Sequence, residues 1–480
     1  MDDRFPSPVY SETVLAPNFE HAKKHLLESL IDIHYAHTRM LAKQRILSEA
    51  EERVLIAALD GLDRDRIGKA GYDGSYEDLF YFVEGMIEEA CGRNVAGQNI
   101  AGKMHTARSR NDIAITLYRM TARRELLATA LGIAELRGVM LELAAKHLET
   151  VMPAHTHTQP AQPTTLGHYL LAACEFLDRD AERMQSAFGR MNLCPLGAAA
   201  ITTSGFPIDR DETARLLGFE GLAENSYGAI AAIDYITEAA GVVAVAMVNL
   251  GKLIQDLLLW STREFGFLRF SDAFVQSSSI MPQKRNPVAL EHTRILASRA
   301  FGEAQAVQTC AHNTPFGDIN DSEDDLQPLV SMMFADARRA LRLLAAAMRT
   351  ATVDREHMAR RAGKDFLTVT ELADTMVRRL GISFREAHAA VAEAVRACGL
   401  DDHPHAIAAA LKRVRPSLPL SIEEIEKALD PHNFVRIRRI TGGPSPERTS
   451  EALARALDRQ NALEAWLTTK LQTLDAVRRR

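Results

Sequence analysis

The sequence predicts a nearly all-helical protein built in three parts. Alanine and leucine are abundant, aromatic residues make up only 6% of the 480 residues, and alternating strand-like runs are rare. The longest helical patterns lie in the middle of the chain. We therefore expect an N-terminal helical domain over residues 1–111, a central bundle of very long helices over 112–362, and a small helical C-terminal domain over 363–480.

The N-terminal part is expected to contain two helical regions and a loop. Helical periodicity runs from residue 17 to about 61, and within it Ser48 and Glu51 have the spacing that favours a helix start. A second helix is expected over 76–92. Residues 97–110 carry glycine, serine and arginine and are expected to form a loop.

The central part holds the long helices, which we expect at 112–148, 165–191, 230–266, 287–312 and 328–350. Three prolines between 152 and 165 exclude a regular helix there, and the segments 192–213 and 313–327 are expected to be irregular. The long helices are apolar over more than one stripe. One stripe packs inside the subunit, so the remainder indicates an oligomer interface.

The C-terminal part is expected to contain shorter helices from Asp354 onwards. Prolines and glycines between residues 430 and 446 predict a loop in that segment.

Composition excludes several classes of function. A net charge of −6 with mixed signs gives no basic stripe for nucleic acid. Five scattered cysteines with no C-x-x-C pair are typical of a reducing cytoplasm and indicate neither a disulfide framework nor a zinc site. The charged N-terminus has no signal core. Polar residues inside the most apolar stretch, 239–259, exclude a membrane span. No cofactor is expected, because no nucleotide-binding loop, redox centre or metal cluster is evident.

The segment Gln276-Ser-Ser-Ser-Ile-Met-Pro-Gln-Lys-Arg-Asn-Pro287 is the most informative part of the chain. It is expected to be a loop that ends at a helix start. Lys284 and Asn286 can hold a carboxylate, and a hydroxyl among such cations loses its proton more easily than a free serine. The alternative is a solvated serine-rich loop without function.

A second candidate segment is His105-Thr-Ala-Arg-Ser-Arg-Asn-Asp112, at the expected start of a long helix. Helix N-termini offer free N–H groups and the positive end of the helix dipole. Arg108, Arg110 and Asn111 add donors for a dianionic ligand. The alternative is an arginine-rich cap that bonds neighbouring carboxylates.

A third candidate segment is His155-Thr-His-Thr-Gln-Pro-Ala-Gln-Pro163, a proline-framed loop with two histidines. Histidine is a proton carrier near neutral pH. The His-x-His spacing would also be compatible with a metal site, but no further cluster of metal-ligating residues accompanies it. Histidines bonded for structure alone are the other alternative. Glu291, on the helix after the serine segment, could fix a histidine tautomer if the two met.

These segments resemble the fumarase/aspartase superfamily, and Met281-Pro-Gln-Lys284 is most similar to its argininosuccinate lyase branch. The resemblance covers most of the chain. Further similar segments are Met40–Ser48, Lys103–Asp112, Cys194–Gly197, Phe206–Arg210, Asn225–Ser226, Asp365–Asp374 and Phe384–His388. The resemblance implies a homotetramer built on a twenty-helix core, in which three subunits form each active site.

The resemblance also implies a role for each site residue. Ser278 matches the catalytic base, on a loop that closes over the substrate. His157 matches the histidine near the leaving group and Glu291 its carboxylate partner, while Lys284 and Asn286 match residues that stabilise the substrate carboxylate. The residues that bind the succinyl half in the family are matched by Ser109, Arg110, Asn111 and Thr156. Two residues of the serine loop, Ser279 and Met281, are also expected to bind substrate.

The chain departs from the family mainly on the amine side. An ungapped match anchored on Pro315 and Pro328 places Asp318, Glu323 and Leu326 where argininosuccinate lyases have a tyrosine, a glutamine and a lysine. Val288 and Phe80 are two further departures, where an aspartate and a histidine are usual. Loss of a lysine and gain of two carboxylates favours an amine with less negative and more positive charge.

The expected function is therefore a carbon–nitrogen lyase that reversibly eliminates fumarate from an N-substituted aspartate, whose amine is not arginine. A diamine, or a guanidine without an α-carboxylate, would fit. The alternatives are an argininosuccinate lyase of arginine biosynthesis, an adenylosuccinate-type lyase, and a non-catalytic structural protein like the lens crystallins related to this family. The expected partners are the small-molecule substrate, fumarate and other copies of the chain.

Overall fold

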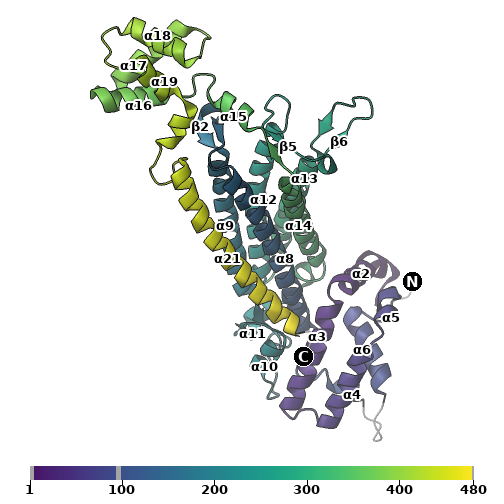
Figure 1. Ribbon diagram of the computed structural model, residues 1–480. Helices are drawn as coiled ribbons and strands as arrows, with labels where there is room; N and C mark the ends of the chain where they lie inside the picture. The colour runs from purple at the N-terminus through teal and green to yellow at the C-terminus, as the bar shows by residue number, and fades with distance from the viewer. Residues whose placement is uncertain (1–4, 93–98, 478–480) are drawn as a thin grey trace.

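The computed structural model describes residues 5–92 and 99–477, and five long helices form its centre (Figure 1). The strands in the described ranges are all short, so the predicted all-α class is confirmed. The five helices pack alongside one another. They are α8 (Arg110–Lys146), α9 (Leu166–Met191), α12 (Asp234–Trp260), α13 (Val288–Ala311) and α14 (Gln327–Arg349).

Helix α8 determines the length of the bundle. Ser109 caps it in a capping box with Asp112, which satisfies N–H groups that the first turn leaves without partners. The helix has 37 residues and therefore spans about 55 Å. Leu127, Ile133 and Leu136 are fully buried, since other helices cover α8 on several sides. The expected helix over 112–148 is thus confirmed, with its start two residues earlier.

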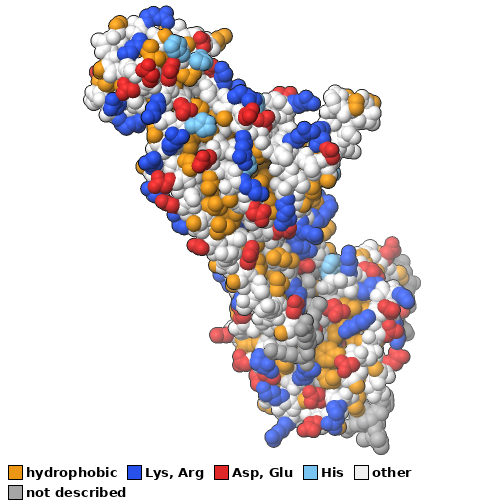
Figure 2. Space-filling view, viewed as in Figure 1, with side chains coloured by type: hydrophobic (Ala, Val, Ile, Leu, Met, Phe, Trp, Pro, Cys, Tyr) orange, Lys and Arg blue, Asp and Glu red, His pale blue; other side chains and the backbone are white. Residues whose placement is uncertain are grey.

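Helix α12 buries one stripe and exposes another. Val243, Leu250 and Leu257 repeat every seven residues and are 0–1% exposed, whereas Val245 and Val248 are 41% and 46% exposed. The helix is long and apolar enough to cross a membrane by length and composition alone. It packs along α9 and α13, which is the environment of a core helix. Apolar side chains also lie exposed over the middle of the bundle (Figure 2).

The proline-containing segment after α8 forms an antiparallel hairpin. Strand β1 (Val151–Thr156) pairs with β2 (Gln159–Thr165), and the connecting residues His157 and Thr158 have φ of 54° and 60°. Positive φ at both central positions is typical of a tight hairpin turn. Prolines lie within both strands of this isolated pair, where unpaired edge positions tolerate a missing N–H.

Three more strand pairs tie loops together. Strand β5 (Leu268–Arg269) pairs with β8 (Thr352–Val353), β6 (Gln276–Ser277) pairs with β7 (Arg285–Asn286), and β3 (Leu193–Cys194) pairs in parallel with β4 (Gly221–Leu222).

The N-terminal helices pack at one end of the bundle (Figure 1). Ser48 and Glu51 form the expected capping box at the start of α4. The expected loop over 97–110 begins outside the described residues and contains the single turn α7. The elements of this part are α1 (Pro8–Tyr10), the π-helical turn η1 (Ser11–Leu15), α2 (Ala16–His25), α3 (Leu27–Lys43), α4 (Glu49–Asp60), α5 (Arg64–Lys69), α6 (Leu79–Cys91) and α7 (Ile100–Lys103).

The C-terminal part differs from the expectation in two places. Four short helices share a core of their own, namely α16 (Val369–Leu380), α17 (Phe384–Cys398), α18 (Pro404–Val414) and α19 (Ile422–Leu429). The expected loop over 430–446 contains a helix, α20 (Pro431–Arg436). The expectation of short helices alone after Asp354 was wrong, because α21 (Pro446–Val477) has 32 residues and packs along α8 and α9. The domain boundaries at 111 and 362 stay a prediction.

The two ends of the bundle carry different loops (Figure 1). The N-terminal end of α8 lies beside the N-terminal helices and the segment 313–326, which includes the 3₁₀ turn η3 (Asn320–Ser322). Near this end lie also α10 (Arg210–Leu216) and α11 (Ser226–Ala231). The far end carries the β1–β2 hairpin, α15 (Arg355–Ala362), the β5–β8 pair and the 3₁₀ turn η2 (Asp272–Phe274).

Candidate functional site

The N-terminus of α8 presents a set of polar side chains whose hydrogen bonds are already made. Ser109 Oγ donates to Asn111 Oδ1 at 2.5 Å, and Asn111 Nδ2 donates to Asp318 Oδ2. Buried Asp112 accepts from Ser109 N at 2.8 Å and from the backbone N–H groups of Gly197 and Ala199 at 2.8 and 2.9 Å. The residues expected to bind a carboxylate thus lie at a helix N-terminus that the hydrogen bonds of Asp112 hold in place.

The two arginines of this segment have different environments. Arg108 is 5% exposed, donates to His34 Nδ1 at 3.1 Å and pairs with Glu84 at 3.2 Å. This is the structural alternative that the sequence left open for Arg108. Arg110 pairs with Glu77 at 2.7 Å and Asp78 at 2.9 Å, and its side chain is 37% exposed.

The pKa of Arg110 is raised on balance, because burial lowers it less than the carboxylates of Asp78 and Glu77 raise it. Its charge is therefore largely compensated within the subunit, and a dianionic ligand would have to compete with both carboxylates.

The segment 313–326 brings three acidic side chains to the same place. Burial, together with a hydrogen bond to Asp318, raises the pKa of Glu323 to about 9. Tyr118 donates to Asp324 at 2.5 Å, and burial raises the pKa of both groups. Oε1 of Glu323 is buried and has no hydrogen-bond partner. Two carboxyl groups hydrogen-bond only when they share a proton, so Glu323 is protonated at neutral pH.

A cavity of about 600 Å³ joins these groups. Asp318 and Glu323 line it together with Ser109, Arg110 and Asn111. Leu326, which stands where the family has a lysine, is 1% exposed and packs in the core instead. The amine-side departures therefore put two carboxyl groups and no ammonium group at the 318, 323 and 326 positions.

The serine loop stands at the far end of the bundle and is exposed. Ser278 Oγ accepts from the backbone N–H groups of Ile280 and Met281 at 3.3 and 3.2 Å, which curls the loop tip. Ile280 is 82% exposed and Met281 37%, and Ser279 is exposed as well. Strands β6 and β7 close the base of the loop.

Arg285 anchors the base of the serine loop. Its guanidinium pairs with Asp272 and donates to the backbone oxygen of Phe270 at 2.8 Å. Because Ser277 pairs with Arg285 in the β6–β7 ladder, this anchor fixes both sides of the loop. Residues 278–284 project beyond it.

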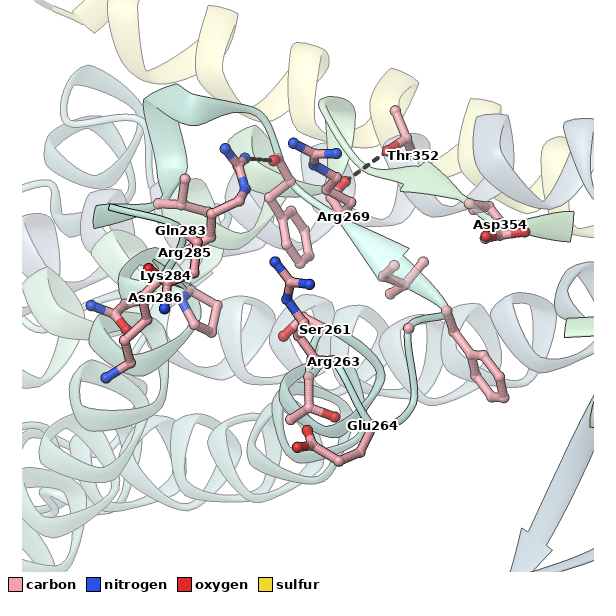
Figure 3. Close-up of a pocket in the computed structure, with 18 of the residues that line it drawn as sticks. Ser261, Arg263, Glu264, Arg269, Gln283, Lys284, Arg285, Asn286, Thr352 and Asp354 are labelled. Atoms are coloured by element: carbon pink, nitrogen blue, oxygen red, sulfur yellow. Dashed lines mark hydrogen bonds between the residues drawn. The ribbon is translucent and has the colours of Figure 1, made fainter. Parts of the chain in front are cut away.

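A second cavity of about 1140 Å³ lies beneath this loop. Lys284 and Asn286 lie on one side of it, and Arg263 and Arg269 come from the segment after α12 (Figure 3). No hydrogen bond or ion pair neutralises the side chain of Lys284 within residues 5–92 and 99–477, so its charge is available to a carboxylate.

The hairpin presents His157 at its tip, and Thr156 precedes it at the end of β1. Both side chains are exposed. Glu291 is exposed in the first turn of α13. Over the described ranges, no hydrogen bond links His157 to Glu291, so one subunit does not by itself form the expected histidine–carboxylate pair.

The site residues thus separate into two groups. Ser109, Arg110 and Asn111 meet Asp318 and Glu323 at one end of α8. The remaining candidates lie at the other end, past the 37 residues of that helix, or about 55 Å away. This second group comprises Thr156, His157, Ser278, Ser279, Met281, Lys284, Asn286 and Glu291.

Sequence reasoning missed several residues that position these groups. Asp112 had a signal, because a carboxylate three residues after a serine predicts a capping box, but its bonds to Gly197 and Ala199 are long-range. Asp272 and Tyr118 carried no local signal for their bonds to Arg285 and Asp324. In the described ranges no group of three or more His, Cys, Asp or Glu side chains could hold a metal ion.

The fold and the arrangement of the signature loops define a lyase of the fumarase/aspartase class. The family model described as lyase matches residues 38–302, and that described as argininosuccinate lyase C-terminal matches 366–436. The chain therefore belongs to the argininosuccinate lyase branch of the fumarase/aspartase superfamily and is a carbon–nitrogen lyase of the fumarate-releasing type.

Individual relatives cover nearly the whole chain. Argininosuccinate lyase 2 of Agrobacterium fabrum is 41% identical over 96% of this chain and 92% of its own. The argininosuccinate lyase of Methanoculleus marisnigri is 38% identical over 91% and 88%. Among solved structures, EDDS lyase in complex with formate has a TM-score of 0.85 at 32% identity, covering 98% of this chain and 94% of that one.

Proposed function

We propose that the protein reversibly eliminates fumarate from an N-substituted aspartate whose amine half carries positive charge and no α-carboxylate. The observation that carries the amine preference is the Asp318–Glu323 pair in the cavity that also holds Asn111. Leu326 supplies no cation there. A cationic amine would bring the counter-charge that the pair lacks.

In the proposed reaction Ser278 removes the proton from the carbon next to a substrate carboxylate. Negative charge then builds on that carboxylate, and Lys284 and Asn286 meet it where it develops. The electron pair left on that carbon forms the double bond of fumarate, the electron pair of the C–N bond moves to the amine nitrogen, and the nitrogen takes up a proton and leaves as the amine. His157, oriented by Glu291, assists at the leaving group. Thr156, Ser279 and Met281, with Ser109, Arg110 and Asn111, hold the succinyl half.

We propose that each site is completed by other copies of the chain in a homotetramer. Asn111 and Ser278 stand at opposite ends of the bundle, so one subunit cannot present both to a small substrate. The exposed Val245 and Val248 of α12, Ile295 of α13 and Met332 of α14 give the bundle an apolar surface for such an assembly.

Mixed assembly tests the shared site directly. Ser278→Ala and Asn111→Leu chains, each inactive alone, are denatured together, refolded and assayed. If different chains supply the two residues, some sites in mixed tetramers receive both intact and activity returns. Mixtures that stay as inactive as either parent, although mixed tetramers are demonstrated by mass spectrometry, would contradict a shared site.

An amine panel tests the substrate proposal. Purified protein is incubated with fumarate and single amines, and products are read by mass spectrometry. We expect adducts with diamines and with guanidines that lack a carboxylate, and little adduct with arginine. Ordinary efficiency with arginine and none with the other amines would instead favour an argininosuccinate lyase, the activity in the names of the sequence relatives. No product with any amine would favour a crystallin-like structural role.

We also propose a cytoplasmic location. All five cysteines are free and Cys174 and Cys194 are buried, which suits a reducing compartment.

A further inference from the structure

Both the oxygen and the nitrogen of the Asn111 side-chain amide have a hydrogen-bond partner within the subunit. Its Oδ1 accepts from Ser109 Oγ at 2.5 Å, and its Nδ2 donates to Asp318 Oδ2. The first bond engages the amide oxygen, so the amide nitrogen is the atom that meets Asp318 at the cavity that both residues line. The group that accepts from this nitrogen is a carboxylate, the same chemical group that the succinyl half of the proposed substrate would present.

Asp318 can leave this position at modest cost. It is exposed, follows Gly317 and precedes η3 in an otherwise irregular segment. Asn111, by contrast, belongs to the first turn of a helix fixed through Asp112. A competing carboxylate would therefore displace the loop side chain and leave the helix in place.

We propose that Asp318 is an internal ligand of Asn111, and that the substrate carboxylate displaces it so that the released Asp318 pairs with the cationic amine of the same substrate. This inference rests on the proposed function and deepens it. It assigns to Asp318 a specificity role with two states, one in the empty site and one in the loaded site.

The Asp318–Glu323 pair makes the displacement of Asp318 from Asn111 selective for a ligand that carries a cation. While Asp318 is bonded to Asn111, it also shares a hydrogen bond with protonated Glu323, whose Oε1 has no partner. A dicarboxylate without an amine would break the Asn111–Asp318 bond and leave Asp318 with no new positive partner. A ligand that carries both a dicarboxylate and a cationic amine gives the released Asp318 a positively charged partner. Dicarboxylate and amine should therefore bind synergistically.

Binding of succinate and 1,2-diaminoethane tests the exchange without turnover, because succinate has no double bond to accept the amine. Calorimetry on the full-length protein should show that the diamine tightens succinate binding in the wild type. In Asp318→Ala, succinate alone should bind about tenfold tighter, since no internal carboxylate competes. The synergy with the diamine should be lost.

Asp321→Ala is the matched control. Asp321 is an exposed acid three residues away in the same loop and does not line the cavity. The substitution removes the same charge without changing a contact of Asn111, so the affinity for succinate and its synergy with the diamine should both stay at wild-type values. Equal gains in the two variants would mean that general electrostatics, rather than displacement of Asp318, controls binding, and would overturn the inference.

Unchanged or weaker succinate binding by Asp318→Ala, in protein with a wild-type circular dichroism spectrum, would also overturn the inference. That result would leave the proposed function standing if wild-type protein still added diamines to fumarate. Conversely, tighter succinate binding by Asp318→Ala, with no addition of any amine by the wild type, would support the exchange and remove the proposed amine chemistry.

Discussion

The two ends of α8 differ in how far their polar side chains are already paired. At its start, Asn111 bonds Ser109 and Asp318, and Arg110 has two carboxylate partners. At the far end, within the described part of the chain, His157 and Lys284 make no side-chain hydrogen bond.

This difference separates two ways of building a binding site. The paired end is preorganised by its own subunit, so a ligand must displace or complement existing bonds there. The exposed end has reactive side chains held only by local turns, and their partners must come from elsewhere. The contrast is what we expect if the first end recognises the amine half and part of the succinyl half, while the second end transfers the proton and binds the carboxylate on which charge develops.

Ser278→Ala should have the largest effect and acts on the exposed end. Loss of the proposed base should lower the rate of elimination by roughly 10²–10⁴-fold. Stability should hardly change, because Ser278 Oγ accepts only from Ile280 and Met281 in its own loop. The rate is followed by the ultraviolet absorbance of fumarate.

Ser277→Ala is the matched control, since the Ser277 side chain makes no hydrogen bond in the described structure. A Ser278→Ala protein with near-normal turnover would remove Ser278 from the role of base and would erase the functional contrast between the two ends.

Arg285→Ala should have the next largest effect, because it loosens the base of the exposed loop. Without the bonds to Asp272 and Phe270 O, Ser278 and Lys284 are held less accurately, and kcat should fall by roughly 10–100-fold. The loss should appear in kcat more than in KM, with partial recovery in Arg285→Lys.

Arg294→Ala serves as its control, since Arg294 is an exposed arginine of α13 that donates to Gln255 at 3.2 Å. If Arg285→Ala had the same kinetics as this control, the anchor would have no part in catalysis.

Glu323→Gln should have a smaller effect, confined to the paired end and dependent on pH. Burial and Asp318 raise the pKa of Glu323 to about 9, so the wild-type cavity gains negative charge as pH rises from 7 to 9. An alkylguanidinium, which stays charged throughout, should inhibit roughly tenfold more tightly at the higher pH. In Glu323→Gln the inhibition constant should not change with pH. A variant that kept the wild-type slope would show that another group titrates.

The sequence predicted the elements of both ends better than the contacts between them. The start of α8 was predictable because Ser109 and Asp112 have capping-box spacing. The prolines after α8 correctly excluded a helix, but the segment was expected to be a loop and forms a hairpin. The Asn111–Asp318 bond joins residues 207 positions apart, and no local pattern contains that information. Helix α21 was missed because its buried residues match grooves on α8 and α9, which the sequence alone does not show.

The amine side shows the same limit. Matching the chain to its family placed Asp318, Glu323 and Leu326 at amine-side positions, but only the structure distinguishes the first two, which line the cavity, from Leu326, which is buried. That the two carboxyls share a proton follows from the burial of Glu323 and its hydrogen bond to Asp318, and neither is a property of the sequence.

Acid should destabilise the protein in part through the paired end, because two buried histidines lie beneath it. His34 accepts from Arg108 and His37 bonds Thr106 O at 2.9 Å. Burial, Arg108 and the neighbouring histidine His105 lower the pKa of His37 to about 3 and that of His34 well below its usual 6.5. The unfolded chain then binds more protons than the native one below pH 6.5, so stability falls as pH falls by up to about 1.4 kcal/mol per pH unit for each histidine.

His37→Gln should reduce this pH dependence, since glutamine can still donate to Thr106 O but does not titrate. The fall in Tm between pH 7.5 and 5.5, measured by calorimetry, should be smaller in the variant by about 1–3 °C. His312→Gln changes an exposed histidine after α13 and should keep the wild-type slope. If His37→Gln showed the same fall in Tm with pH as the wild type, the acid sensitivity would not come from the histidines beneath Arg108.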